Sequence, residues 1–379
     1  MILPKVLILT TNYGNGHLQV AHSLEQEFAD IGIKNVIVKD LFYETSPLLN
    51  EWTRKVYLKS YTTGGRQIYR FFYYSSREIS KRKNLKLLSY GHSKLKKIME
   101  QEQPNLIINT FPFFAVPFHK NKTNSLLPTY NVVTDYCLHH LWVHPTINKY
   151  YIATPKLKDE LVNVGIPEEK VTISGIPIST KFDQPLNEQF LIQKYALDPL
   201  KKTVLIVAGA FGVSKEMKYI CDLLKDDPII QLTIVCGKNR ELYNLLMSTY
   251  RDKENIKVFG YVNHIQELLK IASCVITKPG GVILTEAMAM NIPIIIPRAT
   301  PGQEKENALF FESQGAAIRR ERVPQLVLET KKLIRNEEKQ LMMKAALSRI
   351  HVPRSSKKIT NDILQDFYYQ QIHHQQTNI

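Results

Sequence analysis

Short runs of apolar, mostly β-branched residues recur along the whole chain, and between them lie longer stretches in which apolar residues return every three or four positions. The short runs have the length and composition of buried strands, and the longer stretches have the period of helices that bury one face. Alternation of the two indicates βαβ units around parallel sheets. The pattern therefore predicts an α/β fold in both halves of the chain.

The expected elements can be placed by residue number. In the first half, strands are expected at residues 5–11, 35–40, 105–110, 129–133, 149–154 and 170–174, with helices near 17–29, 94–101 and 155–164. In the second half, strands are expected at residues 203–209, 231–237, 256–260, 274–278 and 293–297.

The length of 379 residues exceeds the usual size of one compact core. Residues 178–202 contain Pro185 and Pro199 and little apolar periodicity, which indicates a link between domains. We predict two Rossmann-like domains, at residues 1–180 and 200–350, then a C-terminal helix and polar tail at 351–379 that frays from residue 362. Ligands are expected in the cleft between the domains, outside the carboxyl ends of the strands.

The composition argues against a membrane-spanning protein, a secreted protein and a zinc-binding protein. Hydrophobic residues make up 44% and charged residues 22% of the chain, no run of about 18 apolar residues is present, and the N-terminus enters a strand directly. A cytoplasmic protein without a signal peptide or membrane span is expected. The cysteines are scattered without zinc-ligand spacing, at Cys137, Cys221, Cys236 and Cys274.

Positive charge is concentrated in one segment. The net charge is +15, and residues 52–97 hold thirteen Lys or Arg against one acid, Glu78, with aromatic residues between them. Cations attract anionic lipid headgroups and aromatics favour the membrane interface, so a peripheral membrane face is expected. A single-strand nucleic-acid groove is the competing interpretation, but no motif of such a module is present; a solvated basic surface remains open. The residues expected to contact membrane or acceptor are Trp52, Arg66, Arg70, Phe71, Phe72, Arg77 and Lys81.

Residues 277–311 contain a candidate phosphate site. A buried strand ends at Thr277, a turn follows at Lys278, Pro279, Gly280 and Gly281, and a helix is expected from Val282. Glycines at a helix start leave backbone N–H groups accessible to a diphosphate. Glu286, one turn further, can accept hydrogen bonds from the vicinal hydroxyls of a ribose.

After the next strand, the segment PGQEKEN offers further polar groups. Gln303, Glu304 and Asn307 match the hydroxyls of a hexose. Either segment alone is as well explained by an ordinary capped helix, but both in order indicate a sugar nucleotide. The turn at Gly209, Phe211 and Gly212 could also support the diphosphate or simply allow helix packing.

The first strand leads into GNGH, with Gly14, Gly16 and His17. Together with Asp40 after the second strand, this resembles a dinucleotide fingerprint, but Gln19 replaces the third glycine. We therefore do not expect nicotinamide binding. His17 at a strand end can act as a general base.

Asp135 follows the strand at residues 129–133 and is the second candidate base, able to take a proton itself or to orient a histidine. His139, His140 and His144 follow, and the sequence does not rank them, although His139 is a candidate acceptor contact. No aspartate-x-aspartate motif is present. Backbone amides and helix dipoles are therefore expected to neutralise charge, with no cofactor and no metal.

Several motifs together resemble one known family. TKPGG, TEA and PGQExxN, with GNGH, VVTDYCLHHLW, SGIPI and AGAFGVSK, are similar to the family 28 lipid glycosyltransferases that include monogalactosyldiacylglycerol synthases and the processive diacylglycerol β-glucosyltransferases of Gram-positive bacteria. The resemblance covers about the first 320 residues. The family's threonine after the glycine pair is replaced here by Ile283, so one donor-site hydroxyl is missing.

The resemblance implies a GT-B fold and an inverting transfer of glucose from UDP-glucose to diacylglycerol, then to monoglucosyldiacylglycerol in a β-1,6 linkage. It also implies a peripheral position on the cytoplasmic membrane face, contact with anionic lipids, and a product that anchors lipoteichoic acid. In this family Gly16 lies near the donor phosphates, and Val262 is at the position that holds uracil through backbone atoms.

Two other kinds of function stay open. One is transfer of galactose or N-acetylglucosamine to another lipid acceptor, because Glu286 and Gln303 would serve all three donors. The other is a non-catalytic protein that binds membranes or nucleic acid through residues 52–97.

Overall fold

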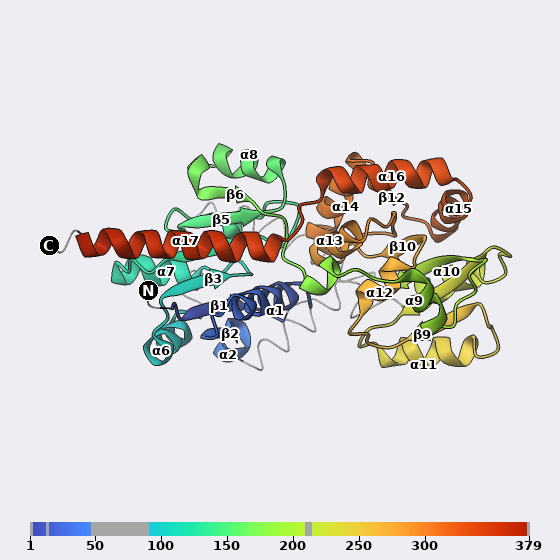
Figure 1. Cartoon of the computed structure of the whole chain (residues 1–379), viewed down its shortest axis with the longest axis horizontal. Helices are drawn as coiled ribbons and strands as arrows, with labels where there is room; N and C mark the ends of the chain where they lie inside the picture. The colour runs from blue at the N-terminus through green and yellow to red at the C-terminus, as the bar shows by residue number, and fades with distance from the viewer. Residues whose placement is uncertain (1–2, 13–14, 47–90, 209–213, 377–379) are drawn as a thin grey trace. The chain divides into compact units, whose positions relative to one another are not determined.

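The computed structural model describes residues 3–12, 15–46, 91–208 and 214–376. The chain divides into two compact units: unit 1 comprises Met1–Thr180 and Val352–Ile379, and unit 2 comprises Lys181–His351. The chain thus returns to unit 1 for its last helix. Each unit is built on a parallel sheet (Figure 1).

In unit 1 the described residues form a six-stranded sheet in the order β2-β1-β3-β4-β5-β6. The strands are β1 (Val6–Thr10), β2 (Val36–Asp40), β3 (Leu106–Asn109), β4 (Thr129–Val132), β5 (Lys149–Ile152) and β6 (Val171–Ile173). The helices are α1 (Asn15–Asp30), α2 (Leu41–Thr45), α6 (His92–Glu102), α7 (Ala115–Thr123), α8 (Pro155–Asn163) and α17 (Ser355–Gln376), with 3-10 turns η1 (His140–Trp142) and η2 (Glu168–Lys170).

Unit 2 has a second sheet of six described strands, in the order β12-β11-β10-β7-β8-β9. Its strands are β7 (Lys202–Val207), β8 (Ile230–Val235), β9 (Ile256–Phe259), β10 (Cys274–Thr277), β11 (Ile294–Ile296) and β12 (Ala317–Arg319). The other elements are η3 (Thr180–Asp183), α9 (Glu188–Lys194), α10 (Ser214–Leu224), α11 (Arg240–Thr249), α12 (Ile265–Lys270), α13 (Gly281–Ala289), α14 (Gln303–Ser313), α15 (Val323–Ile334) and α16 (Glu337–Ile350).

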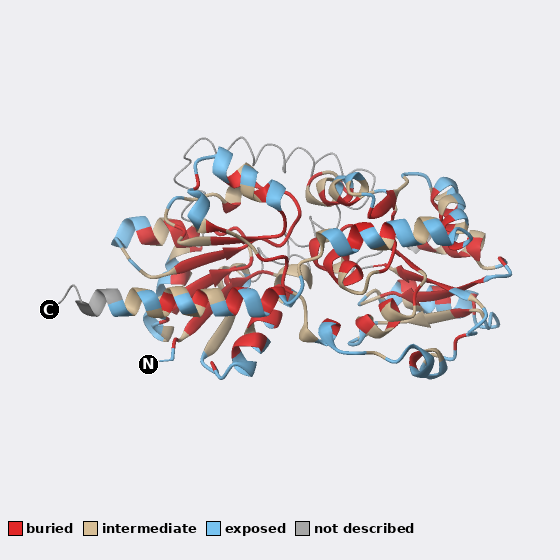
Figure 2. Ribbon diagram, turned by 45° about the horizontal axis from the view of Figure 1, so that its top comes forward, coloured by how far each residue is buried: buried red, intermediate tan, exposed pale blue. Residues whose placement is uncertain are grey.

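The strands carry the core of each unit. Every residue of β1, β3, β4, β8, β10 and β11 is buried, and Figure 2 shows the buried colour concentrated along both sheets. Parallel strands buried on both faces read as continuous apolar runs rather than as alternating patterns. This is why the strands were predictable, and each strand expected from the sequence is present.

Three features differ from the expectations. The proposed link contains α9, whose side chain at Leu191 is buried, and the short strand β12 had not been expected. The prediction that the tail frays from residue 362 is wrong up to Gln376, because α17 continues to that residue. Its Ile359, Ile363 and Phe367 recur every four residues and are buried, so packing of this stripe holds a polar-looking helix in place.

Two tyrosines of the unit 1 sheet also hold α17. Tyr130 Oη donates to Asp366 Oδ2 at 2.6 Å, and Tyr151 Oη donates to Asp362 Oδ2 at 2.7 Å. Lys149 Nζ lies 2.6 Å from the same Asp362 oxygen. The two carboxylates therefore satisfy buried phenols of β4 and β5, and α17 is an integral part of unit 1.

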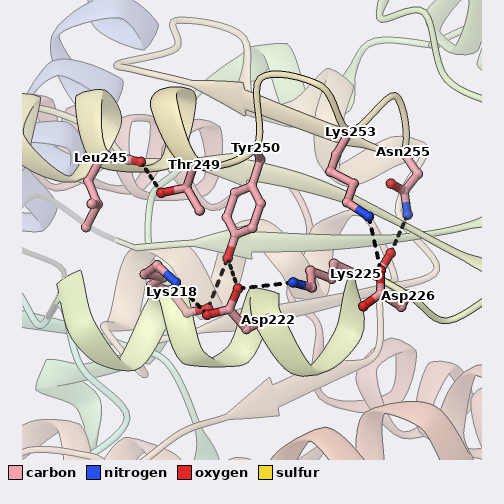
Figure 3. Close-up of polar contacts among 9 residues, drawn as sticks. All are labelled: Lys218, Asp222, Lys225, Asp226, Leu245, Thr249, Tyr250, Lys253 and Asn255. Atoms are coloured by element: carbon pink, nitrogen blue, oxygen red, sulfur yellow. Dashed lines mark hydrogen bonds and ion pairs between the residues drawn. The ribbon is translucent and has the colours of Figure 1, made fainter.

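In unit 2, a polar cluster fixes α10, the helix that begins at Ser214 (Figure 3). Tyr250 Oη donates to Asp222 Oδ1 at 2.8 Å, and Lys218 Nζ donates to Asp222 Oδ2 at 2.7 Å. Asn255 Nδ2 donates to the carbonyl of Lys225 at 2.8 Å. The end of α11 and the approach to β9 are thereby tied to the side of α10.

Gly175 of the SGIPI motif lies where the start of α17 comes closest to the chain after β6. Its φ is +77°, and a Cβ at this position would contact Ser355 Oγ and lie 3.0 Å from Val352 Cβ. We predict that Gly175→Ala destabilises the chain by about 3 kcal/mol, from backbone strain plus this overlap. Urea unfolding followed by circular dichroism measures the loss.

Gly165→Ala is the matched control, because its φ is +93° but no atom of the described residues lies within 4 Å of the added methyl group. It should lose only the strain, about 1 kcal/mol. Equal losses of unfolding free energy in the two variants would show that the close approach of α17 is not the reason why position 175 requires glycine.

Candidate functional site

The strand order of unit 1 gives one place where polar residues from successive strands can meet. In the order β2-β1-β3-β4, the connection after β1 leads to β2 on one side, and the connection after β3 leads to β4 on the other side. Ligands of such sheets bind outside the carboxyl ends of the strands at this switch point. Here β1 and β3 are paired, with Leu9 opposite Asn109. The segment after β1 carries His17, and the segment after β3 carries Thr110 and Phe111.

His17 lies in the first turn of α1, and its ring is held on several sides. Nδ1 lies 2.8 Å from the carbonyl oxygen of Thr110 and 2.9 Å from Oγ1 of Thr134. The ring packs edge-on against Phe111, with centroids 5.1 Å apart. A carbonyl oxygen only accepts hydrogen bonds, so Nδ1 carries the proton and Nε2 has the lone pair. Nε2 has no hydrogen bond to another described residue.

Burial lowers the pKa of His17 below its usual value of 6.5, although the charge of Asp135 and the Thr110 carbonyl oppose this shift. A neutral imidazole with an available Nε2 is the form that a general base requires at neutral pH. Asp135, the other candidate, follows β4 and is itself buried. It acts on His17 through its charge.

The contacts of Asp40 argue against a dinucleotide-binding role for the segment that resembles the dinucleotide fingerprint. Its Oδ2 accepts from the backbone N–H of Asn12 at 2.9 Å, and its Oδ1 accepts from the N–H of Tyr43 at 3.0 Å, which caps α2. The carboxylate that would bind a ribose in a dinucleotide fold is thus bonded to the backbone on both oxygens.

Two of the histidines after β4 have structural contacts. His139 is buried, and its Nδ1 accepts from the N–H of Leu141 at 3.2 Å, capping η1. His144 Nδ1 lies 2.8 Å from Thr146 Oγ1, and burial lowers the pKa of its ring, with the charge of Lys120 adding to the effect. The prediction that His139 contacts acceptor or membrane gains no support from this buried position.

The switch point of unit 2 lies between β7 and β10, because the order is β11-β10-β7-β8. After β10 the chain turns through Lys278, Pro279 and Gly280, and α13 begins at Gly281, one residue earlier than expected. Gly280 is the N-cap with φ −71° and ψ 143°, and no side chain occupies the cap position. The first N–H groups of α13 are therefore available to an anion at this switch point.

Glu286 lies in α13 and is buried, with no hydrogen bond between its carboxyl group and another described residue. Burial raises its pKa to about 8. A buried carboxyl without a partner costs folding free energy when charged, and hydroxyl donors from a ligand would relieve that cost.

The polar residues of α14 are mostly engaged within unit 2. Asn307 is fully buried, and its Nδ2 donates to the carbonyl of Pro279 at 3.0 Å, which fixes the glycine turn from behind. Glu304 Oε2 accepts from the N–H of Thr300 at 3.0 Å. Gln303 is the first residue of α14 and is half-buried, after Gly302 with φ 97°. Asn307 is thus well placed to shape the turn, which sequence reasoning had not anticipated.

The remaining donor-site predictions fall in different parts of the chain. Gly16 is in the first turn of α1, and Val262 follows β9 beside the exposed Tyr261, whose ring lies 5.7 Å from Lys238 Nζ. Ile283 stands where the family has a threonine, so a hydroxyl group is missing from the predicted donor site. The hydroxyl group of Thr285 does not replace it, because its Oγ1 donates to the carbonyl of Gly281 at 2.8 Å. Outside the described residues lie Gly14, Trp52, Arg66, Arg70, Phe71, Phe72, Arg77, Lys81, Gly209, Phe211 and Gly212.

Sequence reasoning missed Thr110 and Thr134. Thr110 directly follows β3 and Thr134 is the second residue after β4, and these two strands neighbour each other in the sheet. That position was the signal that could have found them, since the same logic had selected His17 and Asp135.

Among the described residues, no group of three or more His, Cys, Asp or Glu side chains is arranged to hold a metal ion. None of the helices in this part of the chain combines the length and apolar character needed to cross a membrane.

Comparison with known proteins gives two family matches. Residues 17–178 match the monogalactosyldiacylglycerol (MGDG) synthase family, and residues 188–348 match the glycosyl transferases group 1 family. The chain is 43% identical over 377 residues to a processive diacylglycerol β-glucosyltransferase of Bacillus cytotoxicus, covering 99% of this chain and 95% of the relative. It is 43% identical over 363 residues to the protein of the same name from Bacillus cereus strain B4264, covering 95% and 93%.

Solved structures confirm the predicted fold. The UDP co-structure of S. aureus MnaA has a TM-score of 0.63 at 15% identity and covers 97% of each chain. Acinetobacter baumannii MurG has a TM-score of 0.62 at 12% identity, covering 96% of this chain and all of that one. The chain has the GT-B fold of two Rossmann-like domains.

The raised pKa of Glu286 gives a prediction about stability. Its folded-state pKa of about 8 exceeds the usual value of 4.5, so the folded chain holds a proton that the unfolded chain releases between these pH values. Stability is therefore fully present below pH 4.5 and is lost as pH rises through 8. We expect Glu286→Gln to become more stable relative to the natural chain by up to a few kcal/mol between pH 5 and 9, since one pKa unit corresponds to about 1.4 kcal/mol.

Thermal unfolding across that pH range tests this expectation, with Glu254→Gln as the control because Glu254 is exposed in the same unit. The control should follow the natural chain at every pH. If the stability of Glu286→Gln and of the natural chain changed with pH in the same way, the raised pKa of the buried Glu286 carboxyl group would be contradicted.

Proposed function

Because the chain belongs to the family of the processive diacylglycerol β-glucosyltransferases, we propose that it transfers glucose from UDP-glucose to the free hydroxyl of 1,2-diacylglycerol. A second transfer to monoglucosyldiacylglycerol gives the β-1,6-linked diglucosyl lipid, the glycolipid on which lipoteichoic acid is anchored. The observation that carries the proposal is 43% identity over 99% of the chain.

The geometry supports the chemistry of a single displacement. The acceptor oxygen attacks the anomeric carbon, its proton passes to Nε2 of His17, and the bond from that carbon to the β-phosphate oxygen breaks as UDP leaves. The neutral, Nδ1-protonated ring of His17 suits this step. Attack opposite the leaving group inverts the configuration at the anomeric carbon, and Asp135 stabilises the imidazolium by its charge.

Unit 2 is proposed to bind the donor. The diphosphate is held by the N–H groups that begin α13, with Gly280 at the cap, and the ribose hydroxyls donate to Glu286. Gln303 and Glu304 at the start of α14 contact the glucose, and the backbone near Val262 holds the uracil. No metal ion is included, because the helix start supplies the positive potential.

Lipid products formed from labelled donors test the function. The natural chain, given diacylglycerol vesicles, should form glucolipid from UDP-glucose, including a second spot for the diglucosyl lipid, and form it equally in EDTA. His17→Gln should reduce turnover by about 100-fold or more while keeping UDP affinity, because only the base is lost.

Lipid formed from UDP-galactose or UDP-N-acetylglucosamine alone would replace the proposed donor. Undiminished turnover of His17→Gln would transfer the role of base to Asp135. Absence of any lipid product, with UDP still bound, would reject the proposed acceptor.

Gly280 allows a sharper test of the donor site. Its φ of −71° suits alanine, and within the described part of the chain an added Cβ would meet only Ile283 Cγ2, at an ordinary 3.7 Å. Gly280→Ala should therefore unfold at the same temperature as the natural chain but bind UDP at least about tenfold more weakly, because the methyl group stands where phosphate must approach. Isothermal titration calorimetry measures the affinity. Unchanged UDP binding would contradict the proposal that the diphosphate binds at this turn.

We also propose that the chain binds the cytoplasmic membrane face peripherally, with anionic lipids as partners. The support is its charge of +15 and the thirteen cations in residues 52–97. Replacing Arg66, Arg70, Arg77 and Lys81 with Glu should weaken co-sedimentation with anionic vesicles more than transfer to a detergent-dispersed acceptor. Equal losses in the two assays would contradict a docking role.

A further inference from the structure

His17 and Thr110 are joined by two reciprocal hydrogen bonds. The His17 ring donates through Nδ1 to the Thr110 carbonyl at 2.8 Å, and Thr110 Oγ1 lies 3.2 Å from the His17 carbonyl, to which it can donate. Thr110 is fully buried, and its N–H is bonded to the carbonyl of Leu9 at 3.0 Å. These bonds join the first turn of α1 to the end of β3, and they fix both the backbone and the ring of His17.

Thr134 adds a second oxygen at the same ring nitrogen. Its Oγ1 lies 2.9 Å from Nδ1, and the residue is buried two positions after the end of β4. If Nδ1 were unprotonated, its lone pair would face the Thr110 carbonyl oxygen at 2.8 Å with no proton between them. Both oxygens therefore act as acceptors of one Nδ1–H, and the Thr134 hydroxyl proton is left for another acceptor.

These contacts have a chemical consequence at the opposite ring nitrogen. When Nε2 takes a proton, positive charge spreads over the ring, and hydrogen bonds donated by Nδ1–H become stronger. Two acceptors at Nδ1 stabilise the imidazolium more than one does. They also fix the plane of the ring, because the carbonyl of Thr110 and the hydroxyl of Thr134 come from neighbouring strands.

We infer that Thr134 is a positioning residue for His17, accepting from its Nδ1–H so that Nε2 faces the acceptor hydroxyl as a base. This inference deepens the proposed glucosyl transfer and rests on it for its consequence on rate. The proton moves from the acceptor hydroxyl to Nε2, and the Nδ1–H bonds remain intact throughout. Asp135 contributes through its charge, which favours the protonated ring.

The test combines kinetics with nitrogen NMR of the full-length chain. Thr134→Val removes the oxygen and Thr134→Ser keeps it. Thr129→Val is the control, because Thr129 is a buried residue of β4 whose hydroxyl donates elsewhere, to the carbonyl of Leu127 at 3.1 Å. With ¹⁵N-labelled histidine, the signal of His17 among the 11 histidines is identified by its loss in His17→Gln.

The natural chain should show His17 with Nδ1 protonated and Nε2 unprotonated. Thr134→Val should lower kcat about tenfold and the proton affinity of the ring about tenfold, with the KM for UDP-glucose unchanged, because one hydrogen bond to a charged group is lost. Thr134→Ser should restore both values, and Thr129→Val should change neither.

An Nε2-protonated ring in the natural chain would overturn the inference, and so would a Thr134→Val variant with unchanged kcat and ring titration. The NMR measurement needs no substrate. If the chain forms no glucolipid but the ring behaves as expected, the proposed function fails while the role of Thr134 at the ring stands. If glucolipid forms and the ring does not respond, the positioning role alone fails.

Discussion

The reversal of winding direction in each parallel sheet is the constraint on which the arrangement of polar residues depends. Within a sheet buried on both faces, polar side chains can gather only at strand ends. At the switch point the connections diverge and leave the carboxyl ends of two adjacent strands open. Unit 1 places His17, Thr110 and Thr134 at or beside the β1–β3 switch point, and unit 2 places Gly280 at the β7–β10 switch point.

The same burial that builds these sites also sets the charge of their residues. Removal from water disfavours the charged form of both His17 and Glu286, so the pKa of His17 is lowered and that of Glu286 is raised. A general base must be unprotonated to accept a proton, so the lowered pKa suits the proposed role of His17. For Glu286, proposed to bind ribose, a carboxyl group without a hydrogen bond to another described residue can accept from the hydroxyl groups of a ligand.

The sequence was sufficient to predict every described strand except β12, because the strands are continuous, mainly apolar runs and six of them are buried along their whole length. It also located the glycine turn after β10 and the helix start that carries His17 after β1, whose roles stay predictions. It could not show that Asp40, His139 and Asn307 bond to nearby backbone groups, because residue type does not reveal which donors surround a side chain. The helix α9 was missed because only Leu191 marks its buried face.

The contacts of Thr110 and Thr134 with His17 span 93 and 117 residues of sequence. They depend on the order of strands in the sheet, which the alternation of helices and strands does not specify. A site assembled at strand ends can therefore be located from sequence, while the partners within it require the structure.

The anomeric configuration of the glycolipid product distinguishes direct displacement from transfer through a covalent intermediate. With His17 as the proposed base and the start of α13 as the proposed anion site, the acceptor oxygen displaces UDP directly from α-configured UDP-glucose. Direct displacement predicts a β-linked glucosyl lipid, recognised by the large coupling of its anomeric proton in NMR. An α-linked product, or no glucosyl lipid at all, would contradict it.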